Sequence, residues 1–145
     1  MEVNRNAYLK HFPIDKYVDF VVNRQHSAWD WTQAEQHGKW IESAYLSAVQ
    51  GDDKELLIKA ESVLNRIIDS QEANGYVGAT AKSFRSPERP VRGMDAYELY
   101  FVFHAFITVY EETGDKKALT AAEKLADYFL QYFGPGKLEF WPSDL

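Results

Sequence analysis

Three residues in the second half of the chain are our candidates for acid–base chemistry. His104 lies in an otherwise apolar segment, where an imidazole must find a hydrogen-bond partner. Glu98 lies six residues earlier, nearly two helical turns, so we expect Glu98 and His104 to face broadly the same way. Asp95 lies one turn before Glu98. Two carboxylates at a suitable separation can hydrolyse a glycoside, one as the acid and the other as the nucleophile or base.

Each of these residues also has a structural explanation. His104 could be a core histidine whose hydrogen bonds are satisfied inside the protein. Asp95 and Glu98 stand where the start of a helix favours negative charge. We expect Asp95 to cap its helix, and the sequence leaves both roles open for Glu98 and His104.

Two tryptophans, Trp29 and Trp31, lie in a polar segment. An exposed indole can cover the apolar C–H face of a pyranose or furanose, which makes both residues candidate sugar contacts. The alternative, which we rank first, is that they anchor a loop on the surface of the domain.

The segment 74–93 shows no helical or strand periodicity. Loops of about 20 residues in compact domains are usually functional or disordered. Arg85, Arg89 and Arg92 could bind an acidic sugar through its carboxylate. We favour the simpler interpretation that a solvated loop balances the charge of an acidic domain.

Metal and cofactor sites are not expected in this chain. Glu35 and His37 are two residues apart, and side chains at that spacing on a helix point in different directions. The sequence contains no cysteine, which excludes disulfides, thiolate zinc sites and a cysteine nucleophile within it. No phosphate-binding glycine loop or Ser-His-Asp arrangement is present.

The apolar residues repeat with helical spacing in several segments. We expect a short helix at about 15–24, a helix hairpin at 38–71 and a second hairpin at 95–133. Gly51-Asp52-Asp53 and Gly114-Asp115 are expected to form the turns, with glycine left-handed and aspartate capping the next helix. The segment from Leu99 to Tyr110 is apolar almost all round, which is typical of a helix buried on most sides. The last helix should bury one stripe: Leu119, Ala122, Leu125, Ala126, Phe129, Leu130 and Phe133.

The two hairpins are one unit used twice, because their glycine–aspartate pairs lie 63 positions apart. Alternating buried and half-exposed helices favour two concentric layers. We therefore predict an all-α fold, a fragment of an (α/α) toroid or barrel with two helix-hairpin repeats after an N-terminal helix, as one helical domain over 1–145. Two hairpins cannot close a ring, so we expect the inner-helix edges to be covered by self-association into a dimer.

The composition narrows the possible partners. Hydrophobic residues make up 46% of the chain and charged residues 26%, which is ordinary for a globular protein. A formal net charge of −6 argues against nucleic acid as a partner. No segment has the length of uninterrupted apolar sequence that a membrane helix needs, and the N-terminus has no apolar core of signal-peptide length. The compartment is left open.

Two ordered strings of sequence resemble a known family. The first is HGKWIESAYLSAVQGDDKELLIKAESVLNRIIDSQEANGYVG, and the second is MDAYELYFVFHAFITVYEETGDKKALTAAEKLADYFLQYFGPG. Together they are similar to the N-terminal region of the β-L-arabinofuranosidase-like glycoside hydrolases, family 127 and its relatives, over roughly residues 31–136. The shared features are the Gly-Lys-Trp helix, the Asn-Gly-Tyr-x-Gly loop, Glu-Leu-Tyr with a histidine four residues on, and Phe-Gly-Pro.

The resemblance implies an (α/α)6 barrel that acts on glycosides. It implies that His104 contacts a sugar hydroxyl, and it makes Glu98, Tyr76 and Tyr100, which lie in or beside the shared motifs, candidate substrate contacts. In the best-known branch of the family a cysteine nucleophile, held in a zinc site with other cysteines and a glutamate, lies far downstream. This chain has no cysteine, and Phe101 stands where the family often has one.

The function expected from the sequence is therefore sugar binding within a glycoside hydrolase barrel, without a complete catalytic set in this chain. Two alternatives remain from the sequence alone. One is a non-catalytic helical-repeat module that binds a protein partner. The other is another (α/α) toroid enzyme, such as a sugar epimerase or a polysaccharide lyase.

Overall fold

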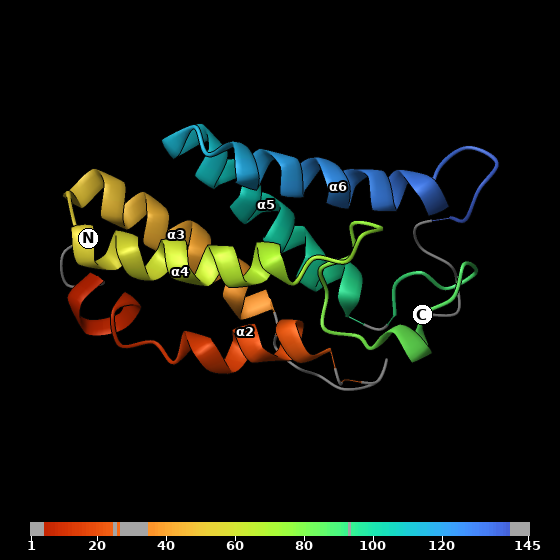
Figure 1. The fold of residues 1–145 in the computed structure, drawn as a ribbon, viewed down its shortest axis with the longest axis horizontal. Helices are drawn as coiled ribbons and strands as arrows, with labels where there is room; N and C mark the ends of the chain where they lie inside the picture. Colours follow the sequence, from red (N-terminus) through yellow and green to blue (C-terminus); the bar gives the residue numbers. More distant parts are fainter. Residues whose placement is uncertain (1–4, 25, 27–34, 93, 140–145) are drawn as a thin grey trace.

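The chain folds into helices joined by short turns and one long loop (Figure 1). The computed structural model describes residues 5–24, 26, 35–92 and 94–139. The helices are the π-helix η1 (Arg5–Leu9), α2 (Ile14–Asn23), α3 (Glu35–Gly51), α4 (Lys54–Asp69), the 3-10 helix η2 (Lys82–Phe84), α5 (Asp95–Thr113) and α6 (Lys116–Tyr132). Among the described residues, β-structure is limited to three isolated β-bridges. The expected all-α fold class is confirmed.

Each hairpin turns at an aspartate that caps the following helix. The amide of Leu56 donates to Asp53 Oδ1 at 3.1 Å, and the amide of Lys117 donates to Asp115 Oδ1 at 2.8 Å. These side chains satisfy amides that have no partner within the first turn of α4 and of α6.

The left-handed residue differs between the two turns. Gly114 ends α5 with φ +73°, as expected. In the first turn Asp52 takes this conformation with φ +48°, and Gly51 is the last residue of α3, so the expectation for Gly51 is wrong. A side chain at Gly51 would collide with the guanidinium of Arg5, which donates to the carbonyl of Ser47. The guanidinium of Arg5 therefore occupies the space that a side chain at position 51 would take.

The helices form two layers. Helices α3 and α5 form the inner layer and pack against each other along their length. Helices α4 and α6 form the outer layer, and each packs against its hairpin partner, α3 or α5 (Figure 1). Helix α2 contacts α3 and α4, and η1 contacts α3. The buried indole of Trp40 donates from Nε1 to the carbonyl of Leu9 at 3.1 Å and holds η1 against α3. The N-terminal segment thus covers the α3 side of the structure.

The inner helices α3 and α5 approach very closely at Gly38. A Cβ atom at this position would lie 2.5 Å from the carbonyl carbon of Phe101 and 2.8 Å from the amide nitrogen of Val102. Both atoms are backbone and cannot turn away. Only glycine permits this spacing, which is how the Gly-Lys-Trp helix start contributes to the fold.

Helix α6 turns a different side to the core than its sequence pattern predicts. Its buried residues are Ala118, Ala121, Ala122, Leu125 and Tyr128. Leu130 is 65% exposed, and Leu119, Ala126, Phe129 and Phe133 are half-buried. Small alanines allow α6 to lie close to its neighbours, so the larger apolar stripe is left at the edge of the hairpin. No helix in the described part of the chain is long and apolar enough to span a membrane.

We expect Gly38→Ala to lower the free energy of unfolding by about 2 kcal/mol, because overpacking costs about 1–3 kcal/mol and the gain in helix propensity is only about 1 kcal/mol. Urea denaturation measures the change. Ser43→Ala, at an exposed position of the same helix, is the matched control and should be neutral or slightly stabilising. A Gly38→Ala protein as stable as Ser43→Ala would contradict the close approach of α3 and α5.

Candidate functional site

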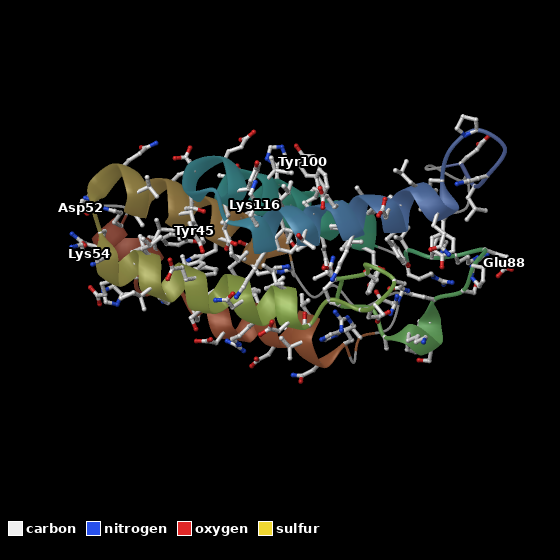
Figure 2. The ribbon with its side chains drawn as sticks, turned by 45° about the horizontal axis from the view of Figure 1, so that its top comes forward. Tyr45, Asp52, Lys54, Glu88, Tyr100 and Lys116 are labelled. Carbon is white, nitrogen blue, oxygen red and sulfur yellow. The ribbon has the colours of Figure 1, made fainter. Side chains whose placement is uncertain are left out.

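The exposed side of α5 carries aromatic and imidazole side chains at helical spacing. Tyr97, Tyr100 and His104 follow one another by about one turn, and the side chains of Tyr100 and His104 are 56% and 52% exposed. Figure 2 shows the Tyr100 side chain at the edge of the molecule, directed away from the other helices. Helix α5 is otherwise buried or half-buried between Leu99 and Tyr110, as expected, and one side of this inner helix faces solvent.

Helix α3 supplies charged side chains beside this aromatic row. His104 Nδ1 lies 3.6 Å from Glu42 Oε1, which also accepts a hydrogen bond from Thr108 Oγ1 at 3.3 Å. The rings of Tyr100 and His104 are 5.2 Å apart. We call the surface formed by Lys39 and Glu42 of α3 with Tyr97, Tyr100 and His104 of α5 the inner face.

The ammonium group of Lys39 completes the inner face. It lies 4.3 Å from the centre of the Phe101 ring and donates to the Tyr97 hydroxyl at 3.4 Å. The inner face thus combines open aromatic rings with hydrogen-bond donors and acceptors. This is the combination that binds a sugar, whose C–H faces are apolar and whose edges carry hydroxyls.

Glu98 does not share this side of α5. It is 4% exposed, whereas His104 is exposed, so the expectation that both face the same way is wrong. Six residues advance an α-helix by about 600°, which leaves the two side chains roughly 120° apart. Glu98 and Asp95 are both turned into the protein.

Asp95 does not cap α5 as expected. The residue before the helix is Met94, which makes no side-chain capping bond, and Asp95 is the first residue of the helix. Its carboxylate accepts from the Tyr76 hydroxyl at 2.9 Å, from Thr80 Oγ1 at 2.8 Å and from the Arg92 amide at 3.1 Å. All three donors belong to the loop between α4 and α5, so Asp95 fastens that loop to the helix.

Burial raises the pKa of both the Asp95 carboxyl and the Tyr76 hydroxyl. It raises the pKa of Asp95, against the opposing effect of its hydrogen bonds from Thr80, Tyr76 and Arg92. Burial, together with the nearby Asp95 carboxylate, also raises the pKa of Tyr76 well above its ordinary value. Tyr76 therefore remains a hydroxyl donor, and the same hydroxyl accepts from the Thr80 amide at 3.1 Å.

The loop is more ordered than a solvated charge-balancing segment. Residues 75–80 are buried, and the guanidinium of Arg85 stacks 3.5 Å above the centre of the Tyr76 ring while it pairs with Glu72. The interpretation of Arg85 as a solvated residue is wrong, since only 5% of its side chain is exposed. Arg89 is exposed and Arg92 is half-buried.

The segment before α3 joins the same assembly. Arg24, just after α2, donates to the carbonyl of Gly78 at 3.1 Å and also bonds to the carbonyl of Ser70. The amide of Ala81 donates to the carbonyl of His26 at 3.0 Å. Arg24 and His26, which follow α2, therefore lie beside the loop that precedes α5.

The sequence-predicted site residues are thus divided. Tyr100 and His104 lie together on the inner face, whereas Tyr76 and Glu98 are buried. Trp29 and Trp31 lie outside the described residues. Sequence analysis missed Glu42, although its spacing of one turn from Lys39 on α3 was a usable signal. It also missed Thr80, for which the sequence offers no local signal.

The side chains present do not fit the thiolate zinc site that the resemblance implies for larger enzymes. The chain has no cysteine, and the part of it that the structure describes has no group of three or more His, Asp or Glu residues that could hold a metal ion.

Comparisons with known proteins agree on one family. Residues 3–140 match the family model of the GH127 catalytic domain of β-L-arabinofuranosidases. A non-reducing end β-L-arabinofuranosidase of Bifidobacterium longum subsp. longum is 29% identical over 104 residues, which are 67% of this chain and 16% of that protein. A solved GH127 β-arabinofuranosidase has the same fold with a TM-score of 0.67 and 21% identity, over 96% of this chain and 26% of that one. The chain therefore spans about a quarter or less of the length of these relatives.

We expect Asp95→Asn to change how stability depends on pH. The buried Asp95 has a pKa above its ordinary value of 3.8, so the native protein binds this proton more tightly than the unfolded chain. The wild type then loses stability as the pH rises from about 4 through the native pKa, and the asparagine variant does not. The stability of Asp95→Asn relative to the wild type should rise over this interval and level off above it. Urea unfolding between about pH 3.5 and pH 7 gives both curves, and the same rise in the exposed Asp127→Asn would refute this assignment.

Proposed function

Because the chain belongs to the GH127 family of β-L-arabinofuranosidase catalytic domains, we propose that it forms the N-terminal part of a glycoside-hydrolysing barrel and binds a sugar on its inner face. The proposal has two parts. The first is that the inner face is a sugar-binding surface, and the second is that hydrolysis requires residues outside this chain.

One observation carries the first part. The side chains of Tyr100 and His104 are exposed next to each other on an inner-layer helix. Large aromatic side chains exposed together on one surface often mark a binding site. In a closed barrel the free side of an inner helix lines the interior, which is where the substrate of such an enzyme must enter.

The polar groups of the inner face support a neutral sugar as the ligand. His104 has one ring nitrogen near Glu42, and its exposed side chain can offer the other nitrogen to a hydroxyl. Lys39 is already engaged by Tyr97 and lies 3.8 Å from Glu35, so its charge is partly compensated. An uncharged furanose fits this surface better than an acidic sugar, because no uncompensated cation faces it.

The second part rests on what the described residues bring together. Glycoside hydrolysis uses two carboxyl groups, or an equivalent nucleophile and acid, on either side of the scissile bond. Asp95 and Glu98 are buried, and in the described part of the inner face Glu42 is the carboxylate that lies beside His104. We therefore propose that this chain contributes binding and that the nucleophile and acid come from elsewhere in a complete enzyme. No observation favours an epimerase or a lyase over this function.

We expect methyl β-L-arabinofuranoside to bind the 145-residue chain. In NMR, saturation of the protein's aromatic protons should transfer to the sugar. Tyr100→Ala and His104→Ala should each weaken binding about tenfold, the usual cost of one lost hydrogen bond or ring contact. The wild-type sample should release no free arabinose, because the catalytic set is incomplete.

Tyr8→Ala is the matched control, since Tyr8 is also a half-exposed tyrosine but lies on η1. A wild type that shows no binding, or an equal loss in Tyr8→Ala, would contradict the sugar site. Hydrolysis that disappears in Glu98→Gln would contradict the second part and place catalysis in this chain.

We also propose that the isolated chain self-associates through the open edge of its second hairpin. This edge carries the exposed Leu130 with half-buried Phe129 and Phe133 of α6, and half-buried Phe103 and Ile107 of α5. The first hairpin has its flank covered by α2 and η1, whereas the described residues provide no equivalent helix for the second. A second copy would bury this apolar surface in the way a further hairpin does in a longer barrel.

Light scattering at micromolar concentration should give a mass above the 16.8 kDa of one chain. Leu130→Glu should shift the protein toward the monomer, because it places a charge within the proposed contact. Ile58→Glu, at a similarly exposed position of α4, should leave the mass unchanged. A monomeric wild type, or an equal effect of the two variants, would refute association through this edge.

A further inference from the structure

The sequence of α5 indicates only weakly which side of the helix turns inward. Between Leu99 and Tyr110 the polar side chains, apart from tyrosine hydroxyls, are His104 and Thr108. Apolar residues therefore occur on every side of the helix, and the buried and half-buried ones surround most of it. Burial of apolar surface chooses the orientation of a helix only when one side is more apolar than the other. Leu99, Phe106 and Val109 do turn inward, but half-buried apolar residues flank them, so apolar burial alone fixes the rotation of α5 only loosely.

The Asp95 carboxylate lies almost opposite the exposed residues of α5. His104 is nine residues further on, about two and a half turns, so its side chain leaves the helix about 180° from that of Asp95. The same arithmetic places Tyr97 and Tyr100 within roughly 40° of that opposite side. Whatever holds Asp95 inside the protein thus holds Tyr97, Tyr100 and His104 outside it.

The groups that hold Asp95 are themselves held by other segments. The Tyr76 ring lies under the Arg85 guanidinium and 5.5 Å from the ring of Tyr128 on α6. A side chain at Gly78 would collide with the Tyr76 hydroxyl, so the loop turns tightly around that group. Arg24 fixes the carbonyl of Gly78 from the end of α2. The Tyr76 hydroxyl therefore cannot follow Asp95 if α5 rotates.

Rotation of α5 by half a turn would be unfavourable in free energy for three reasons. The Tyr76 hydroxyl, Thr80 Oγ1 and Arg92 amide would lose their acceptor, and buried donors without a partner are expensive. The imidazole of His104 would also enter the apolar core. Rotation would also remove the buried Leu99, Phe106 and Val109 from the core, so the apolar contacts favour the same orientation.

We infer that Tyr76, Thr80 and Asp95 form a rotational lock, a set of positioning residues that, together with the apolar contacts of α5, fixes which side of the helix becomes the inner face. The lock acts through the helix and does not touch a ligand. It presents Tyr100 and His104 to the sugar, and this last consequence rests on the function proposed above. The orientation of α5 itself does not depend on that function.

The absence of cysteine from the sequence allows a direct test with single thiols. Tyr100→Cys places a thiol on the exposed side of α5, and Ala105→Cys places one at a fully buried position. Reaction with an aromatic disulfide reagent should be fast for the first variant and slow for the second. The ratio of the two labelling rates reports the orientation of the helix without any ligand.

Each thiol is then combined with a variant of the lock. Tyr76→Phe and Thr80→Val remove one donor each with little change of shape, and Asp95→Ala removes the acceptor. We expect the labelling of Ala105→Cys to rise about tenfold in the single-donor variants relative to Tyr100→Cys, because one buried hydrogen bond is worth about a factor of ten. The effect of Asp95→Ala should be larger.

Tyr128→Phe is the matched control. Tyr128 is a buried tyrosine next to Tyr76, and its hydroxyl donates to the carbonyl of Pro90 at 2.6 Å instead of to Asp95. It should lower the free energy of unfolding measured in urea without changing the labelling ratio. If Tyr76→Phe and Tyr128→Phe raise the labelling of Ala105→Cys equally for an equal loss of stability, the lock only stabilises the fold and the inference is wrong.

Two further outcomes keep the test decisive. If Asp95→Ala fails to fold, the ratios in Tyr76→Phe and Thr80→Val still decide. A changed ratio in a protein whose wild type binds no sugar would support the lock and reject the proposed function. An unchanged ratio in a protein that binds sugar through Tyr100 and His104 would reject the lock alone.

Discussion

A buried carboxylate is the constraint on which much of this structure depends. Asp95 is almost fully removed from solvent, and an ionised group in that position requires donors from the protein. The loop between α4 and α5 supplies them from Tyr76, Thr80 and the Arg92 amide. This requirement explains why residues 75–80 are buried although they form neither helix nor strand. It also explains the surrounding cations, since Arg85 and Arg24 secure the loop that carries the donors.

The second constraint is the distance between the inner helices. Gly38 lets α3 approach the backbone of α5, which brings Lys39 and Glu42 beside the row of Tyr97, Tyr100 and His104. The inner face therefore depends on two features at different places. The glycine sets the distance between α3 and α5, and the carboxylate sets the rotation of α5. Neither feature belongs to the face itself.

The exposed apolar surface follows from the family architecture. The chain spans 26% of a solved relative with the same fold, and its second hairpin has no neighbour among the described residues. Helix α6 packs on the core through alanines and leaves Leu130 and its neighbours at the edge. A helix with two partly apolar sides is suited to a position between two neighbours. Of the α6 stripe predicted from sequence, Ala122 and Leu125 are buried, and the remaining residues form a partly exposed apolar surface at the edge of the hairpin.

Local interactions determined what could be predicted from the sequence alone. Helix periodicity, the caps at Asp53 and Asp115 and the left-handed Gly114 act within a few residues, so the helices, their turns and the repeated hairpin follow from the sequence pattern. The resemblance over residues 31–136 added the family. Tertiary structure decided the rest. It buried Glu98, gave Asp95 partners up to 19 residues away and made Asp52, instead of Gly51, the left-handed residue of the first turn. The physical reason is that apolar residues occur on every side of α5, so its periodicity indicates the orientation only weakly. The donors that hold Asp95 lie in segments whose positions only the tertiary structure sets.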